Sequence, residues 1–439
     1  MDTFAEKLSI VGAWAGQNKY LSAIKNAFQN FMPATIAGAI GILWTSVLVN
    51  SETGLGKLWE PIMALEVLNP IFSAIQYATI SCITVGITML IAQEIAESNG
   101  ENGAYPAVLG FILWLVVTPT TNVAEAFVNK SGEVASFTGI ASSYTDATRL
   151  FTGIIVAIVG MEIYNLFRKM DAVKIKMPEQ VPPGVARAFE VLVPTIITAI
   201  IVGGIGLICQ LVTGAELNAL IYNAIQKPLG SIIGDNIIAV MLLYILIMLF
   251  WFVGIHGPNM VSGVRDPIFK PLLYANMTAF QQHKEIPNVF NLTMLEMFGQ
   301  VTGSGLTIGL IISIFIFGKR EDNRAIATLS IVPGLFNINE TITFGIPMVL
   351  NPILAVPFIF TPAICIFVGW ILINIGFCPR IVLEVPWTTP PLLQGFLATG
   401  GNIMGALSQL IVLALSVILY APFFMAYERY QNKQYSEVD

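Results

Sequence analysis

The stretch VLVPTIITAIIVGGIGLICQLV, residues 191 to 212, contains no charged side chain. As a helix it is long enough to cross a hydrocarbon core of about 30 Å, which takes about 20 helical residues. Similar apolar runs lie along the whole chain, several of them broken by Gly or Pro, and they are 31–49, 71–92, 104–117, 150–167, 237–252, 306–317, 353–377 and 406–425. The sequence therefore predicts an all-α polytopic membrane protein.

The composition supports this prediction. Hydrophobic residues make up 55% of the 439 residues and charged residues only 11%, whereas charged residues make up about 25% of a soluble domain. Membrane lipid is therefore the expected surroundings of most of the chain. The net charge of −6 and the absence of a basic stripe in the sequence give no sign of a nucleic-acid partner.

Residues 1–30 have a different pattern. Lys7, Lys19 and Lys25 alternate there with apolar residues at spacings near three and four. This pattern is typical of an amphipathic helix that lies in the plane of the membrane surface.

Basic residues indicate the orientation of the first half. The polar linker from Arg168 to Glu190 carries five of them, so the positive-inside rule places it in the cytoplasm. The loops 51–70 and 118–148 then lie outside, and their only basic residues are Lys57 and Lys130. By the same counting, the N-terminus is cytoplasmic.

The second half conflicts with the same rule. If every later run crossed the membrane fully, Lys319, Arg320 and Arg324 would lie outside. Some segments must therefore enter and turn back, and the stretches 251–305 and 332–357 have the Gly, Pro and Asn content for it. Irregular backbone at membrane depth usually lines a binding site, so we expect the site in the C-terminal half.

Two ionisable residues in these stretches are candidates for chemistry. His256 ends an apolar run just before Gly257 and Pro258. Its imidazole either has a functional role in the site or only forms a hydrogen bond with the backbone at the end of a helix. Glu340 lies in a polar cluster between apolar runs, and a carboxylate there can take a proton from a hydroxyl. Its structural alternative is a capping box, because Asn337 precedes it by three residues.

Aromatic and polar residues near these two are candidates for substrate contacts. The indoles of Trp251 and Trp387 are suited to stacking on the apolar face of a sugar, although tryptophans also mark membrane interfaces. Amides and hydroxyls that are able to bind sugar hydroxyls, or to cap backbone groups instead, belong to Asn259, Asn339, Thr341 and Thr388.

Missing motifs narrow the function classes. The sequence has no G-x-x-x-x-G-K-[ST] phosphate loop, no G-x-S-x-G elbow and no H-E-x-x-H helix. We therefore expect no metal and no cofactor. A proton-coupled secondary sugar transporter, with Glu340 and His256 as proton carriers, is the main alternative to the function inferred below. A membrane-embedded hydrolase lacks a convincing nucleophile and base.

The sequence resembles the lactose/cellobiose family of IIC transporters of the bacterial sugar phosphotransferase system. The resemblance rests on NKYLSAIKNAF, residues 18 to 28, leading into Met32 and Pro33, and on the His256 and Asn339–Glu340–Thr341 segments. It implies about ten transmembrane helices with two re-entrant hairpins in the C-terminal half. It also implies a homodimer with both termini in the cytoplasm, in the bacterial inner membrane.

The resemblance further implies how the chain works. A disaccharide such as N,N'-diacetylchitobiose or cellobiose would cross the membrane while a cytoplasmic IIB protein, supplied by IIA, phosphorylates it. Glu340, aided by His256, would act on the sugar hydroxyl, and no residue of this chain would itself be phosphorylated. The expected domains are the amphipathic helix (1–30), a scaffold and dimerisation domain (31–213), an amphipathic connection (214–235) and a substrate domain (236–439).

Overall fold

A computed structural model describes residues 10, 14, 16–51, 55–128, 134–178, 180–232 and 236–436. Most of the predicted amphipathic segment before residue 18 lies outside these residues. The first long helix is α2 (Lys19–Leu43), which is followed directly by the π-helical turn η1 (Trp44–Leu48). Residues 19–30 thus belong to the same helix as the first apolar run.

Long apolar helices dominate the described chain, which is helical and of the polytopic membrane type, as predicted. Five helical stretches are long and apolar enough to cross a membrane, or six if a bent pair forms one span; the five are Lys19–Leu48, Ala147–Arg168, Pro183–Thr213, Pro352–Asn374 and Ile403–Lys433. The bent pair, Glu60–Thr79 and Ile83–Ser98, breaks the predicted run 71–92 at an angle of 44°.

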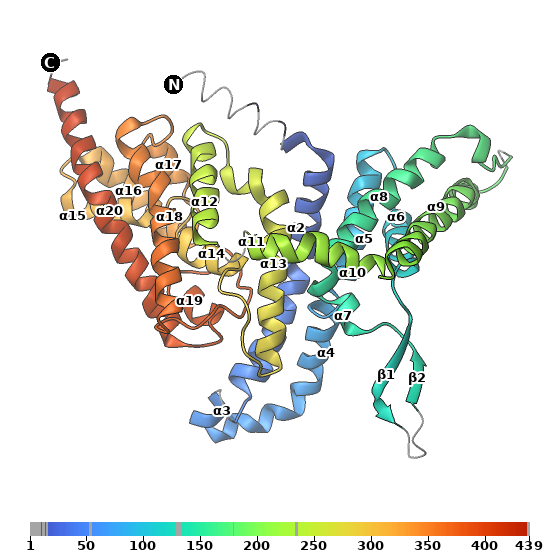
Figure 1. Cartoon of the computed structure of the whole chain (residues 1–439). Coiled ribbons are helices and arrows are strands. Elements are labelled where there is room, and N and C mark those ends of the chain that lie inside the picture. The colour runs from blue at the N-terminus through green and yellow to red at the C-terminus, as the bar shows by residue number, and fades with distance from the viewer. Residues whose placement is uncertain are drawn as a thin grey trace. The chain divides into compact units, whose positions relative to one another are not determined.

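One element of the described chain departs from the all-helical prediction. The strands β1 (Thr121–Val128) and β2 (Val134–Thr138) form an antiparallel ribbon, with Thr121 opposite Thr138 (Figure 1). The ribbon lies in the loop 118–148, which joins two apolar helices. It leaves the helical class of the protein unchanged.

The chain divides into two compact units. One contains Met1–Gln17, Ala39–Ser73 and Gly230–Asp439, and the other contains Asn18–Gly38 and Ala74–Leu229. We call them unit 1 and unit 2. Helices α2 and α4 (Asn69–Thr79) contribute residues to both.

Unit 2 is a bundle built on α5. Helix α5 packs on α6 and α8, and α8 packs on α9. At one end of the bundle, Arg168 forms an ion pair with Glu101 at 3.2 Å, and the Tyr164 hydroxyl also donates to Glu101. The elements of the bundle are α5 (Ile83–Ser98), α6 (Tyr105–Val116), α7 (Ser142–Thr145), η3 (Ala147–Arg149), α8 (Leu150–Arg168), η4 (Asp171–Val173), α9 (Pro183–Thr213), α10 (Leu217–Ile221) and η5 (Tyr222–Gln226), and α11 (Lys227–Ile232) leads out of it.

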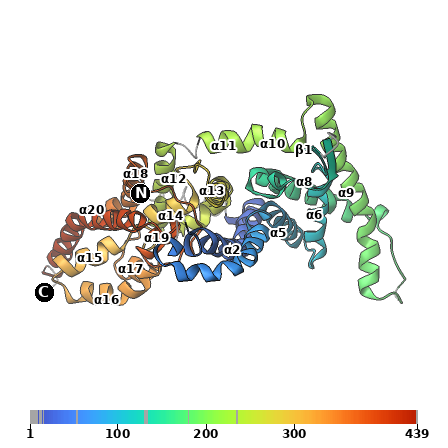
Figure 2. The same cartoon turned by 90° about the horizontal axis from the view of Figure 1, so that it is seen from below.

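Unit 1 is organised around the long helix α20 (Ile403–Ser436). Helices α15 and α18 pack on α20, and α15 lies between α16 and α20 (Figure 2). The other elements of this unit are α3 (Leu55–Leu58), η2 (Glu60–Leu68), α12 (Ile237–Phe252), α13 (Gly257–Gln281), α14 (Leu292–Gly299), α15 (Ile308–Phe317), α16 (Glu321–Leu335), α17 (Glu340–Gly345), α18 (Pro352–Asn374) and α19 (Leu393–Ala398).

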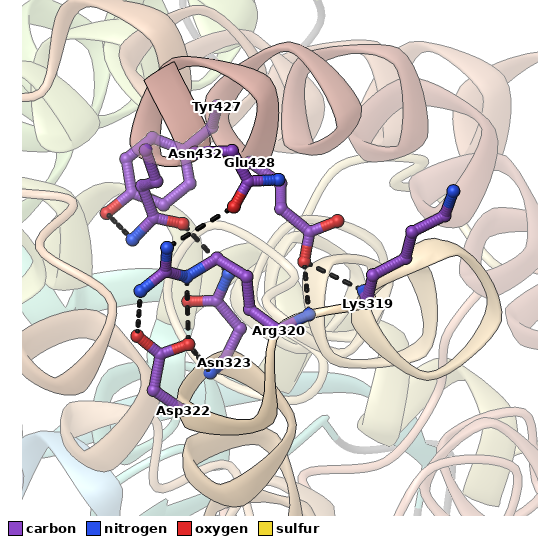
Figure 3. Close-up of polar contacts among 8 residues, drawn as sticks. Lys319, Arg320, Asp322, Asn323, Tyr427, Glu428 and Asn432 are labelled. Atoms are coloured by element: carbon purple, nitrogen blue, oxygen red, sulfur yellow. Dashed lines mark hydrogen bonds and ion pairs between the residues drawn. The ribbon is translucent and has the colours of Figure 1, made fainter. Parts of the chain in front are cut away.

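A polar cluster fixes the turn between α15 and α16 to α20. The buried carboxylate of Glu428 accepts the backbone N–H groups of Lys319 and Arg320, each at 2.9 Å (Figure 3). The Arg320 guanidinium pairs with Asp322 at 2.7 Å and donates to Asn432 at 3.3 Å. Because these contacts meet both ends of the turn, α15 and α16 form a helical hairpin whose closed end is held by α20.

A close helix approach supports the rest of this hairpin. A Cβ atom added to Gly309 of α15 would lie 2.6 Å from the backbone of Ser416 in α20. One turn earlier, the Tyr420 hydroxyl donates to the Gly305 carbonyl at 2.7 Å. Contacts near both ends of α15 thus hold this helix against α20.

We expect Gly309→Ala to destabilise the protein by about 1–3 kcal/mol, because the new methyl group meets rigid backbone and forces α15 away from α20. Gly334→Ala is the matched control, since a Cβ there meets only the end of the Ile311 side chain, at 3.5 Å. Thermal unfolding in detergent measures both variants. Equal stability of the two would contradict the close approach.

Candidate functional site

His256 stands at the junction of α12 and α13. Its imidazole Nδ1 accepts the backbone N–H of Asn259 at 3.3 Å, so that the histidine caps α13. The neutral ring therefore carries its proton on Nε2. The side chain is exposed in the single chain, which leaves Nε2–H available to a ligand.

Trp251 places this imidazole beside α17. Its ring lies 4.7 Å from the ring of His256 and 6.5 Å from that of Phe344, a residue of α17. The indole is buried, with 3% of its surface exposed. Glu340, the first residue of α17, lies within electrostatic range of His256. Both of these predicted ionisable side chains are exposed in the single chain.

The capping box suggested by the sequence does not form. The residue that caps α17 is Asn339, and its side chain makes no capping hydrogen bond. Its amide instead donates to the Ser304 carbonyl at 2.6 Å and to the Thr343 hydroxyl at 3.3 Å. Because Asn337 does not cap the helix, the Glu340 carboxylate is not held as its reciprocal partner.

Asn337 makes long-range contacts that the sequence did not reveal. Its side-chain oxygen accepts the backbone N–H of Thr302, and its amide donates to the carbonyl oxygens of Trp387 and Thr389. The only local signals were the Asn-x-Asn spacing of 337 and 339 and the Gly-Ser-Gly at 303–305. Three segments far apart in sequence therefore meet at the residues that precede Glu340.

The other residues that were predicted to contact the substrate form an exposed and a buried group. The Asn259, Thr341, Trp387 and Thr388 side chains are exposed. Trp251 and Asn339 are buried, and the Asn339 amide is already used within the protein. The four exposed side chains are therefore accessible to a ligand, whereas Trp251 and Asn339 contact other residues inside the protein.

Buried ion pairs lie further along α13. Arg265 and Asp266 pair at 2.8 Å, and Lys270 pairs with Glu384 at 3.7 Å, in the segment that leads to Trp387. All four side chains are at most 10% exposed. The second pair fixes the Trp387 segment to the helix that begins at His256.

The chemistry available is that of one carboxylate, one imidazole, aromatic faces and amides. Within the described residues no group of three His, Cys, Asp or Glu side chains is placed to hold a metal ion. A carboxylate within electrostatic range of an imidazole N–H suits the binding and deprotonation of a hydroxyl.

Sequence comparisons relate the whole chain to one family. The family described as "Phosphotransferase system, EIIC" matches residues 25–362. The lichenan permease IIC component of Bacillus subtilis is 30% identical over 438 residues, which cover 98% of this chain and 94% of that protein. The cellobiose-specific EIIC component of Lactococcus lactis is 29% identical, with 97% of each chain covered.

A solved structure has the same fold. It is the crystal structure of the transporter ChbC, the IIC component from the N,N'-diacetylchitobiose-specific phosphotransferase system. The TM-score is 0.89 at 29% identity, and the match covers 99% of each chain. The similarity therefore includes both units.

Proposed function

This chain belongs to the EIIC family of the phosphotransferase system, and on that premise we propose that it transports a disaccharide, N,N'-diacetylchitobiose or cellobiose, which binds between Glu340, His256 and Trp387. As an EIIC component it is an integral membrane sugar permease that works with IIB and IIA partners. The proposed sugars are those named for its similar proteins.

The Trp251 ring, which contacts both His256 and Phe344 of α17, and the electrostatic interaction between His256 and Glu340 carry this proposal. A sugar 6-hydroxyl between them would accept the Nε2–H of His256 and donate to the Glu340 carboxylate. As phosphoryl passes from IIB to this oxygen, Glu340 would take its proton, as a general base does. Both side chains are exposed, so that sugar and the phosphorylated partner have access to them.

The exposed neighbours would orient the sugar. The Trp387 indole, 48% exposed, offers a face for stacking on sugar C–H groups. The side chains of Asn259, Thr341 and Thr388 would bind further hydroxyls. Trp251 would hold the ring of His256 in place, and Asn339 would hold the backbone near Glu340 in place.

We also propose the finer topology of ten transmembrane helices with two re-entrant hairpins. At 1.5 Å per residue, α15 is about 15 Å long and α16 about 22 Å, and both are shorter than a core of about 30 Å. With Lys319 and Arg320 in the cytoplasm, as the positive-inside rule requires, both helices would end inside the hydrocarbon core, and the chain would turn back in the predicted stretches 251–305 and 332–357. Both termini would then be cytoplasmic, in the bacterial inner membrane.

The proposed assembly is a lipid-embedded homodimer in which unit 2 supplies the scaffold and unit 1 the sugar site. Phosphorylation would make transport directional. The product carries about two negative charges, which an aromatic surface with a nearby carboxylate disfavours. Release toward the cytoplasm would follow.

Transport by vesicles containing the purified chain tests the proposal. With IIB supplied in its phosphorylated form, we expect the disaccharide to accumulate as its 6-phosphate. A pH gradient alone is expected to drive no accumulation. Uptake of unmodified sugar that follows the pH gradient would instead establish the proton-coupled alternative.

A further inference from the structure

Asn337 is the point where three segments of unit 1 meet. Its side chain accepts from the Thr302 N–H and donates to the Trp387 and Thr389 carbonyls. The carboxylate residue Glu340 follows three positions later. One amide thus links the loop between α14 and α15, the segment that begins α17, and the loop that carries Trp387.

A second amide repeats the link to the first loop. Asn339 donates to the Ser304 carbonyl at 2.6 Å, and a Cβ on Gly303 would lie 2.6 Å from the Asn339 side chain. Gly303 also has φ +92°, a value that glycine adopts without strain. The loop at 302–304 is therefore held against the segment 337–339 at two places.

Asparagine suits position 337 for two reasons. Its backbone has φ +64°, in the left-handed region that Asn tolerates better than most residues. Its amide has both an acceptor and a donor, and the contacts use both. Aspartate keeps the acceptor, but its second oxygen would face two carbonyl oxygens.

From these contacts we propose that Asn337 is a positioning residue that holds the Trp387 loop in register with Glu340, a role that rests on the proposed function. The side chain itself need not touch sugar. It fixes the carbonyl of Trp387, and through it the position of the indole, relative to the carboxylate that acts on the hydroxyl. The aromatic face and the acid then hold one sugar in a single orientation.

Asn337→Asp is the primary test, with Asn374→Asp as matched control. The Asn374 amide donates only to a carbonyl of its own helix, that of Trp370. We expect Asn337→Asp to weaken sugar affinity about tenfold, since the loss of a hydrogen-bond donor and the new repulsion are of this size. The kcat of phosphorylation at saturating sugar should change less than about threefold, because Glu340 and His256 remain. The control should leave both values unchanged.

A double-mutant cycle tests whether Asn337 acts through Trp387. In the Trp387→Ala background, Asn337→Asp should weaken affinity no further, because the ring that it positions is gone. Losses that multiply would overturn the proposal. An unchanged affinity of Asn337→Asp alone would overturn it too.

Hydrogen exchange provides a readout that needs no sugar. Asn337→Asp should speed amide exchange in residues 300–305 and 387–389 together while the rest of unit 1 stays protected. Faster exchange throughout unit 1 would indicate general unfolding and overturn the specific role. If the wild-type chain neither binds nor phosphorylates a disaccharide, the proposed function fails, and the exchange pattern alone then decides whether the three segments are tied.

Discussion

Replacing Glu340 with glutamine should lower the rate of sugar phosphorylation by about 10² or more, the size expected when general-base help is lost. Sugar binding should persist, because the amide keeps a carbonyl oxygen that accepts a hydrogen bond. The expected signature is therefore a fall in kcat with little change in the dissociation constant of the sugar. Phosphoenolpyruvate-dependent phosphorylation and direct binding measure the two quantities.

The stability of the Glu340→Gln variant should change little. The carboxylate is exposed and stands in the first turn of α17, where a negative charge contributes about 0.3–1 kcal/mol through the helix dipole. A loss of activity therefore reports on chemistry and not on folding. Thermal unfolding of the variant checks this condition.

Glu321→Gln is the matched control. Glu321 is also an exposed acid in the first turn of a helix, α16, at the opposite end of the hairpin. It should phosphorylate sugar at the wild-type rate. Phosphorylation by Glu340→Gln at the rate of this control would remove Glu340 from the role of base.

The sequence predicts the helices well where burial in lipid alone decides the outcome. The run 237–252 coincides with α12, and 191–212 lies within α9, because apolar side chains and paired backbone groups are both required in hydrocarbon. The bend between α4 and α5 was not predictable from hydropathy. Both sides of the break are apolar, so only packing determines that the run is interrupted.

Part of the candidate site could be proposed from the sequence. His256 and Glu340 stood out because ionisable groups between apolar runs are rare, and the two residues lie within electrostatic range of each other. The role of Asn337 was missed, since its partners at 302 and 387 lie far away in sequence and local spacing suggested a cap. Long-range hydrogen bonds of this kind leave no periodic signal.

Breaking the Lys270–Glu384 pair should destabilise the protein strongly. Its side chains are 6% and 10% exposed, and Glu384 has a second buried oxygen without a hydrogen-bond partner among the described residues. Lys270→Met would leave that carboxylate without its cation. Loss of one partner of a buried pair costs about 3–5 kcal/mol, so we expect a destabilisation of that size in thermal or denaturant unfolding.

Two further variants separate burial from the mere loss of a charge. Lys270→Met combined with Glu384→Gln should recover most of the stability, because replacing both members of a buried pair by neutral groups is often close to neutral.

Lys19 and Glu162 form an ion pair at 2.7 Å in unit 2, and their side chains are 35% and 33% exposed. Since exposed pairs contribute at most about 1 kcal/mol, Lys19→Met should cost far less than Lys270→Met. Equal losses in the two single variants would show that Lys270 does not neutralise a buried charge.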